Sequence, residues 1–213
     1  MSSGLPKDDD RHAAKMAIRK EAQDKKLADK TTGKGLLIVH TGTGKGKSTA
    51  AFGMAMRMIA QSRGDGPLRG RKVGIVQFIK GAWESGEREV LEAFPDVVEV
   101  HAEGNGFTWE TQDREKDVAS VEAAWTQAAR MLADESYAMV ILDELNIALR
   151  YDYIDLVKVV EALVARPAMQ HAVATGRNAK PEMIEAADLV TEMTLVKHPF
   201  KEQGIKAQAG VEY

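Results

Sequence analysis

The chain has 213 residues, of which 44% are hydrophobic, and this length and composition suit one α/β domain. Its formal net charge of -3 argues against a general nucleic-acid binder, and the absence of cysteine excludes disulfides, thiolate zinc sites and cysteine nucleophiles. No apolar run approaches the ~18 residues that span a bilayer, and no secretion signal opens the chain. We therefore expect a soluble cytoplasmic protein that binds neither nucleic acid nor membrane.

Residues 1–34 form a polar segment of mixed charge. Its stretch RHAAKMAIRKEAQDKKLADK is rich in helix formers, but the apolar residues in it are small and sparse. Two interpretations stay open: a disordered arm, or a helix that docks on another surface. We therefore expect two parts, an N-terminal extension over 1–34 and one folded domain over 35–213.

Strands and helices alternate from residue 36 onward. Short apolar runs predict strands at 36–40, 72–79, 97–102, 137–142, 171–176 and 189–196. Helical patterns lie between them, at 47–62, 86–94, 113–133, 153–166 and 181–187. Trp125 lies on the apolar stripe of one helix and is expected in the core, whereas the position of Trp83 in a loop is ambiguous. This alternation predicts an α/β fold with a mostly parallel sheet covered by helices on both faces.

The stretch VHTGTGKGKSTAAFG is close to the phosphate-binding loop, or P-loop, of nucleotide-binding proteins. That pattern requires Gly, four residues, then Gly-Lys-Ser/Thr; Gly46, Lys47 and Ser48 fit, but Thr41 stands where the first glycine should be. In a strand–loop–helix setting, the amides of Gly44 to Ser48 can surround phosphate oxygens. Lys47 would reach the outer phosphates and the Ser48 hydroxyl would bind Mg²⁺. The alternative is a glycine-rich turn without a ligand.

The stretch MVILDEL supplies a second half for such a site. An apolar strand that ends in Asp143 and Glu144 brings carboxylates to the edge of the sheet where ligands bind in open α/β folds. Asp143 would hold Mg²⁺ directly or through water. Glu144 would be a metal ligand or a base that polarises water, and the alternative is an acid at a helix start without a role.

Two further features are ambiguous from the residues alone. In GNGFTWETQ, Phe107 and Trp109 are either lid residues packed on the core or an apolar wall over a flat ligand. In TGR, Arg177 follows a predicted strand and is either an anion contact or an ordinary surface arginine. The five histidines have no metal-ligand spacing, so no transition-metal site is expected.

A series of motifs resembles the corrinoid adenosyltransferases of the P-loop type, in order from about residue 35 to Tyr213. The motifs are TGTGKGKSTAAFG, VQFIKGAWESGE, GFTWETQ, VILDELN, ARP, TGR and VKHPFKEQGIKAQAGVEY. The loop of that family typically reads Gly-Asn-Gly-Lys-Gly-Lys-Thr, so the displaced glycine belongs to the resemblance. This chain has Thr43 in place of Asn and Ser48 in place of Thr. Ser48 keeps the hydroxyl, whereas the contact of the Asn amide is left open.

The resemblance implies an activity. Such enzymes transfer the 5′-deoxyadenosyl group of ATP to cobalt(I) of a corrinoid and release triphosphate, in adenosylcobalamin biosynthesis or salvage. Cobalt(I) is the nucleophile, so the protein needs no nucleophilic side chain. Its task is to position the reactants and to stabilise the departing triphosphate. We therefore expect Lys47 and Glu144 to be catalytic.

The resemblance also implies a set of binding residues and partners. The metal, Mg²⁺ with Mn²⁺ as an alternative, is expected from the loop and carboxylate patterns at Ser48, Asp143 and Glu144, and the resemblance assigns the corrinoid to Phe107 and Trp109. It further implies a RecA-like fold, a nucleotide bound in a flipped sense, a homodimer, a transient reductase partner and an N-terminal segment that closes over an active site. The expected nucleotide-binding residues are Gly42, Thr43, Gly44, Lys45, Gly46, Lys47, Ser48, Thr49, Arg57 and Arg177.

Two other classes of protein share the loop and the carboxylates. A P-loop ATPase or small-molecule kinase would convert ATP to ADP. A nucleotide-dependent switch would bind ATP, make little product and change partners. Triphosphate that appears without ADP separates an adenosyltransferase from both.

Overall fold

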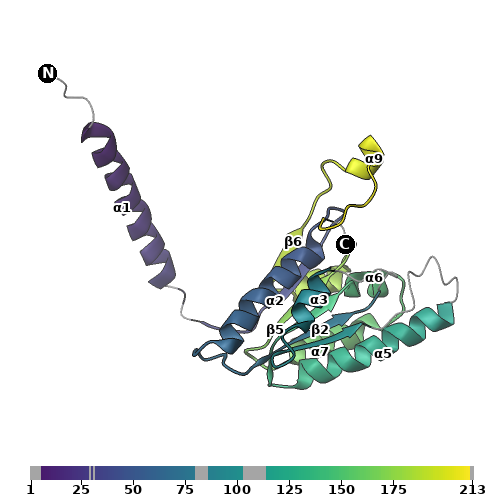
Figure 1. Ribbon diagram of the computed structural model, residues 1–213. Coiled ribbons are helices and arrows are strands. Elements are labelled where there is room, and N and C mark those ends of the chain that lie inside the picture. The colour runs from purple at the N-terminus through teal and green to yellow at the C-terminus, as the bar shows by residue number, and fades with distance from the viewer. Residues whose placement is uncertain (1–5, 29, 31, 80–85, 103–113, 212–213) are drawn as a thin grey trace. The chain divides into compact units, whose positions relative to one another are not determined.

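A six-stranded parallel sheet forms the centre of the computed structural model, which describes residues 6–28, 30, 32–79, 86–102 and 114–211. The strand order is β3-β2-β4-β5-β1-β6, and every neighbouring pair is parallel. All six described strands therefore end at one side of the sheet, which we call the carboxyl edge (Figure 1). The strands are β1 (Leu37–Thr41), β2 (Lys72–Gln77), β3 (Val98–Ala102), β4 (Tyr137–Asp143), β5 (His171–Thr175) and β6 (Leu189–Glu192).

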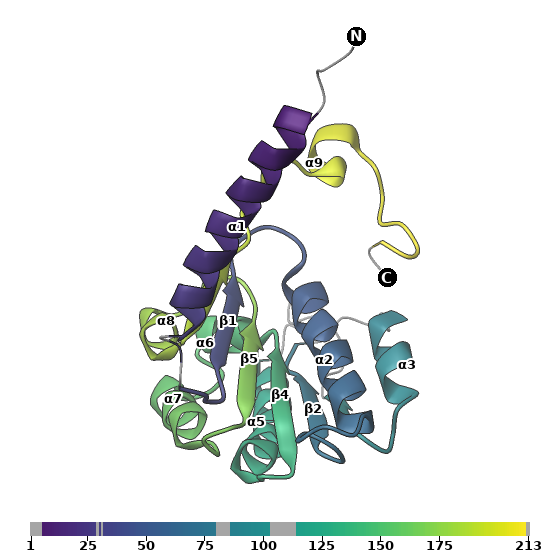
Figure 2. The ribbon, with the colours of Figure 1, turned by 90° about the vertical axis from the view of Figure 1, so that its left-hand side faces the viewer.

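Helices cover both faces of the sheet. Ile38 of β1 joins a buried cluster with α2 and α3, whereas its neighbours Leu37 and Val39 join a second cluster with α5, α6, α7 and α8. Side chains alternate between the faces of a strand, so β1 contributes to both clusters. Figure 2 shows the strands between α2 and α3 on one side and α7 and α8 on the other. The helices of this unit are α2 (Lys47–Arg63), α3 (Gly86–Glu92), α5 (Arg114–Ala133), α6 (Leu145–Arg150), α7 (Leu156–Ala165), α8 (Pro181–Ala186) and α9 (Pro199–Gln203).

This architecture confirms the predicted α/β P-loop fold with a parallel sheet between two helical layers. The expected core position of Trp125 is also confirmed, because its side chain is 3% exposed and packs beside Phe78 with 6.5 Å between ring centroids. Trp83 lies outside the described residues.

The structure corrects three element predictions. The last strand ends at Glu192 rather than at residue 196, because the chain meets the loop after β1 at Met193, whose carbonyl accepts from the amide of Gly44 at 2.6 Å. The short helices α6 and α9 were not predicted. Helix α6 begins directly after Glu144, which has a left-handed backbone. The sequence therefore has no Ser, Thr, Asp or Asn at the capping position that would indicate a helix start.

The chain divides into two compact units, Met1–Gly33 and Lys34–Tyr213. The first contains the helix α1 (Pro6–Ala28), so most of the described part of this segment is helical. Residues 12, 13, 15–25, 27 and 28 of this helix are all exposed. Throughout the described ranges, no helix combines the length and the apolar composition that a membrane crossing would require.

Candidate active site

The loop between β1 and α2 explains why the first glycine of the pattern is displaced by one residue. Thr41 still belongs to β1 and pairs with Glu192 of β6, so the turn begins only at Gly42. Gly42 has a φ of 95°, and a Cβ atom there would lie 2.4 Å from the Met193 carbonyl oxygen. A longer first strand therefore moves the glycine requirement from position 41 to position 42.

Lys47 lies at the first position of α2, with its side chain folded into the loop. Its Nζ atom donates to the carbonyl oxygens of Gly42 at 3.0 Å and Gly44 at 2.6 Å, and the residue is 7% exposed. Burial lowers the pKa of Lys47 from its ordinary value, and the negative charge of Glu144 opposes that shift. The ammonium group is thus held at the centre of the loop, where phosphate oxygens can replace the two carbonyls as acceptors.

Asp143, the last residue of β4, receives three hydrogen bonds. Ser48 Oγ and Thr175 Oγ1 each donate to Oδ1 at 2.7 Å, and Gln77 Nε2 donates to Oδ2 at 3.2 Å. The carboxylate is buried, with 5% of the residue exposed. These bonds connect the start of α2 with the ends of β2, β4 and β5, so the loop and the predicted carboxylate pair form one site.

Glu144 follows Asp143 with an unusual backbone conformation. Its φ is 59°, in the left-handed region, and its amide donates to Thr175 Oγ1 at 3.0 Å. Burial, followed by the charge of Asp143, raises the pKa of Glu144 to about 7, against opposing contributions from Lys47 and Arg177. A buried carboxyl beside a second carboxylate is a group whose ionised form a bound cation stabilises.

Gly176 has no side chain, and this absence makes room for the carboxylate of Glu144. Its φ is 122°, and a Cβ atom there would lie 2.9 Å from Asn146 Cβ and 3.1 Å from Glu144 Oε2. Asn146 Nδ2 also donates to the Gly176 carbonyl at 3.1 Å. The turn after β5 and the start of α6 therefore fit together only when residue 176 has no side chain.

The residues at this edge fit a magnesium ion that is shared with a nucleotide. The donor set is two adjacent carboxylates and the Ser48 hydroxyl, and Mg²⁺ in phosphate-transfer sites uses one or two carboxylates together with water and phosphate oxygens. Among the residues that the structure describes, no group of three or more His, Cys, Asp or Glu could form an all-protein metal cage. The arrangement suits Mg²⁺, and the same oxygen donors also suit Mn²⁺.

The other predicted site residues divide into three groups. Thr43, Lys45, Thr49 and Arg177 are exposed, and Arg177 is near enough to shift the pKa values of both Lys47 and Glu144. Arg57 is exposed nearly three turns further along α2, roughly 15 Å from Lys47 along the helix axis, so the structure does not bring it to the loop. Phe107 and Trp109 lie outside the described residues.

Three polar residues at this edge did not enter the predicted site. Gln77 and Thr175 donate to Asp143, and His40 pairs in register with Thr175 across β1 and β5. His40 is 6% exposed, and neither of its ring nitrogens has a hydrogen-bond partner. Each of the three directly follows apolar residues at or next to the carboxyl end of its strand, and this sequence signal could have identified them.

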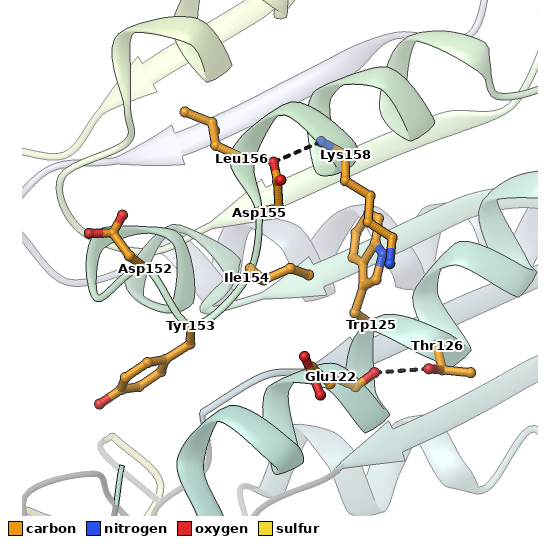
Figure 3. Close-up of a pocket in the computed structure, with 9 residues that line it drawn as sticks. All are labelled: Glu122, Trp125, Thr126, Asp152, Tyr153, Ile154, Asp155, Leu156 and Lys158. Carbon is orange, nitrogen blue, oxygen red and sulfur yellow. Dashed lines mark hydrogen bonds between the residues drawn. The ribbon is translucent and has the colours of Figure 1, made fainter. Parts of the chain in front are cut away.

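A separate pocket of about 650 Å³ lies between α5 and the segment that leads into α7 (Figure 3). One of its carboxylates has a structural role, because Asp155 caps α7 by accepting from the amides of Val157 and Lys158. The pocket contains none of the residues of the loop or of the carboxylate pair, so the candidate site remains at the carboxyl edge. Its lining residues are Glu122, Trp125, Thr126, Asp152, Tyr153, Ile154, Asp155, Leu156 and Lys158.

The parallel sheet, the loop after β1 and the carboxylates after β4 define a P-loop nucleotide-binding protein of the α/β class. Comparison with known families identifies it further. Residues 33–213 match the family described as ATP:corrinoid adenosyltransferase BtuR/CobO/CobP, and residues 1–27 match the cob(I)alamin adenosyltransferase N-terminal family. The chain belongs to the ATP:corrinoid adenosyltransferase family, and the prediction that it is a transferase of this family is confirmed.

Curated proteins named corrinoid adenosyltransferase are similar to this chain over almost their whole length. A corrinoid adenosyltransferase of Sinorhizobium sp is 57% identical over 97% of this chain and 94% of its own. One of Pseudomonas aeruginosa is 53% identical over 98% of both chains, and one of Escherichia coli K12 is 46% identical over 96% of this chain and 99% of its own. The match therefore extends from the N-terminal segment through the loop to the end of the chain.

Proposed function

We propose that this chain transfers the 5′-deoxyadenosyl group of ATP to cobalt(I) of a corrinoid, in adenosylcobalamin biosynthesis or salvage. Cobalt(I) supplies the electron pair for the new bond to C5′, and the C5′–oxygen bond breaks so that triphosphate leaves with its electrons. The hydrogen bond from Ser48 to Asp143 carries the nucleotide part of this proposal, because it joins the phosphate loop to the carboxylate pair. Family membership supports the corrinoid part.

The loop residues act on the departing triphosphate. Lys47 exchanges its two carbonyl acceptors for phosphate oxygens, so a buried positive charge stabilises the negative charge that develops on the leaving group. Exposed Lys45 and Arg177 add positive charge around the same position. Gly42 and Gly46 have backbone conformations that let the loop curve around an anion.

Ser48, Asp143 and Glu144 would hold Mg²⁺, with Mn²⁺ as the alternative. When bound, the ion neutralises charge on the triphosphate. The Ser48 hydroxyl donates its proton to Asp143, which leaves its oxygen lone pairs free for a cation. Because transfer to cobalt needs no attacking water, we assign Glu144 to the metal rather than to a water-polarising base.

The remaining assignments rest on the family resemblance. Phe107 and Trp109 would form an apolar wall beside the corrinoid, and the nucleotide would lie in a flipped sense in the loop. We also propose a homodimer in the cytoplasm, a transient reductase that supplies electrons to cobalt, and an N-terminal segment that closes over an active site. Sedimentation of the purified protein tests the dimer directly.

One assay separates this function from its competitors. The protein is incubated with ATP and a chemically reduced corrinoid, and both the adenosylated corrinoid and the phosphate product are measured. We expect adenosylated product together with triphosphate in equal amounts, and no ADP. ADP production that is independent of corrinoid would identify an ATPase or kinase instead, and tight ATP binding without any product would identify a nucleotide switch.

A further inference from the structure

Thr175 occupies a special position between the two carboxylates of the site. It is the last residue of β5 and is fully buried, at 0% exposed. Its hydroxyl accepts a hydrogen bond from the Glu144 amide at 3.0 Å and donates one to Asp143 Oδ1 at 2.7 Å. One side chain from a neighbouring strand therefore contacts both members of the carboxylate pair.

The backbone of Glu144 needs such support. A left-handed conformation is unfavourable for a residue with a side chain, so the surrounding contacts must hold it in place. Its carbonyl accepts from the amides of Ile147 at 3.1 Å and Ala148 at 3.4 Å, which fixes the side of Glu144 that faces α6. Thr175 supplies the contact on the other side, through the amide.

The bonds of Thr175 differ from those of the other donors to Asp143. Gln77 donates to the other carboxylate oxygen of Asp143, Oδ2, and Ser48 is itself an expected metal ligand. A threonine side chain has few rotamers, so its hydroxyl has a well-defined direction once the strand is in place. Thr175 can therefore hold both carboxylate residues in a defined place relative to β5.

We infer that Thr175 is a positioning residue whose hydroxyl sets the relative orientation of Asp143 and Glu144 for binding a divalent cation. This inference rests on the proposed function, because it assigns the cation to the same pair of carboxylates. Thr175 acts through these two residues and does not itself bind the cation or the nucleotide. Its effect is therefore expected on metal affinity, with little effect on the binding of ATP alone.

The test compares Thr175→Val, which keeps the shape of the side chain, with Thr175→Ser, which keeps the hydroxyl. Binding of Mn²⁺ to the full-length protein with ATP and without corrinoid is measured from the electron paramagnetic resonance signal of free Mn²⁺. We expect Thr175→Val to weaken Mn²⁺ binding roughly 10–100-fold, as removal of partners of metal ligands usually does, and Thr175→Ser to stay within about threefold of wild type. Affinity for metal-free ATP should change by less than about twofold in both.

Thr191→Val is the matched control. Thr191 lies on β6 in register with His40. The substitution there makes the same chemical change in the same sheet, but away from the two carboxylates. Melting temperatures of all variants show whether each is folded, and Thr175→Ala replaces the valine variant if that one does not fold. Unchanged Mn²⁺ affinity in folded Thr175→Val, an equal loss in Thr191→Val, or an equal loss in Thr175→Ser would each overturn the inference.

The assay also separates this inference from the proposed function. Mn²⁺ binding is measured without corrinoid, so a Thr175-dependent metal site in a protein that makes no adenosylated corrinoid would sink the proposed function and leave the inference intact. Normal adenosyl transfer together with a metal affinity that is independent of Thr175 would support the proposed function and overturn the inference.

Discussion

Lys47 donates a 2.6 Å hydrogen bond to the carbonyl oxygen of Gly44, three residues earlier in the loop. Gly44 in turn donates its amide to the carbonyl of Met193 at 2.6 Å. The lysine is therefore held by a loop residue that is itself attached to the end of β6. This amide was expected to turn inward toward phosphate, and in the structure it points to the chain instead.

Lys47→Ala is expected to abolish adenosyl transfer at low ATP, because it removes charge-assisted contacts to triphosphate that are worth roughly 1.5–3 kcal/mol each. Transfer from ATP to chemically reduced corrinoid, measured over a range of ATP concentrations, checks this. Lys158→Ala, an exposed lysine on α7, is the control and should keep wild-type activity. Wild-type turnover of Lys47→Ala at low ATP would show that the loop is wrongly assigned.

Asp143→Asn and Glu144→Gln should each raise the Mg²⁺ concentration that gives half-maximal activity. Both changes keep the shape of the side chain and remove negative charge from the proposed metal site. Excess Mg²⁺ should restore part of the activity, which a titration of transfer rate against Mg²⁺ measures. If a variant shows no rescue at any concentration, the residue has a proton-transfer or structural role instead.

Gly42→Ala should disrupt the loop, because its φ of 95° is strained for alanine and the new Cβ would lie 2.4 Å from a backbone oxygen. We expect a large rise in the KM for ATP together with a lower melting temperature. Gly53→Ala makes the same change inside α2, where a Cβ meets nothing within 4 Å. It should stabilise the protein by about 1 kcal/mol, since glycine is unfavourable in a helix. Equal effects of the two changes on ATP binding would contradict the assigned role of Gly42.

Glu99 on β3 provides a pH-dependent contribution to stability. Burial alone would raise the pKa of Glu99, but hydrogen bonds from Tyr137, His101 and Arg130 outweigh it and lower the pKa to about 2 from an ordinary value of 4.5. The carboxylate therefore stabilises the fold above pH 4.5, and this contribution is lost as the pH falls from there toward 2. Glu99 therefore contributes to the decrease in the free energy of unfolding at acidic pH.

Glu99→Gln should lower the free energy of unfolding by about 1–2 kcal/mol at pH 7, a value reduced because the group is partly exposed. Urea unfolding of wild type and variant between pH 3 and 7 measures the difference, which should shrink on the acid side. Glu92→Gln, which removes an exposed pair with Arg88, should be nearly neutral at every pH. A difference for Glu99→Gln that stays constant with pH would rule out the ionic origin.

Phe107 and Trp109 lie outside the described residues, so their role stays a prediction from the resemblance. An apolar wall on the lower face of a corrinoid would exclude water and displace the axial ligand, and cobalt(II) without that ligand accepts an electron more readily. Phe107→Ala and Trp109→Ala should therefore keep ATP affinity and still react with cobalt(I) supplied by a strong reductant. They should fail when a weaker, biological reductant must act on bound cobalt(II).

A packing role for these aromatics makes a different prediction. It predicts equal loss of activity with both reductants and a lower melting temperature. Measuring both assays beside thermal unfolding decides between the two, and equal losses with reduced stability would sink the proposed role.

The sequence predicted the parts of the site that local pattern determines. Lys47 and Ser48 could be located because strand, glycines and helix follow one another along the chain, and Asp143 because it ends an apolar run. Thr175 and Gln77 could not be assigned as its partners, because their contact with Asp143 requires that β5 and β2 flank β4. That order of strands is a property of the whole sheet rather than of any one stretch.

The missed elements have the same kind of cause. Helix α6 has six residues and directly follows a left-handed residue, Glu144, so neither its length nor its start gives a helical signal. The end of β6 depends on the loop after β1, because the Met193 carbonyl accepts a hydrogen bond from Gly44 of that loop. An apolar pattern that continues to residue 196 contains no sign of this contact.

The bond between Gly44 and Met193 also has a consequence for how the protein is made. The glycine loop is translated before the backbone oxygen that accepts the hydrogen bond of Gly44, because that oxygen belongs to Met193, far along the chain from the loop. Strand β6, which pairs with β1 and ends one residue before Met193, likewise follows the other five described strands along the chain. A nascent chain therefore lacks the hydrogen bond from Gly44 to Met193 until residue 193 has been translated, so a truncated product that ends before Met193 keeps the glycine motif without this contact.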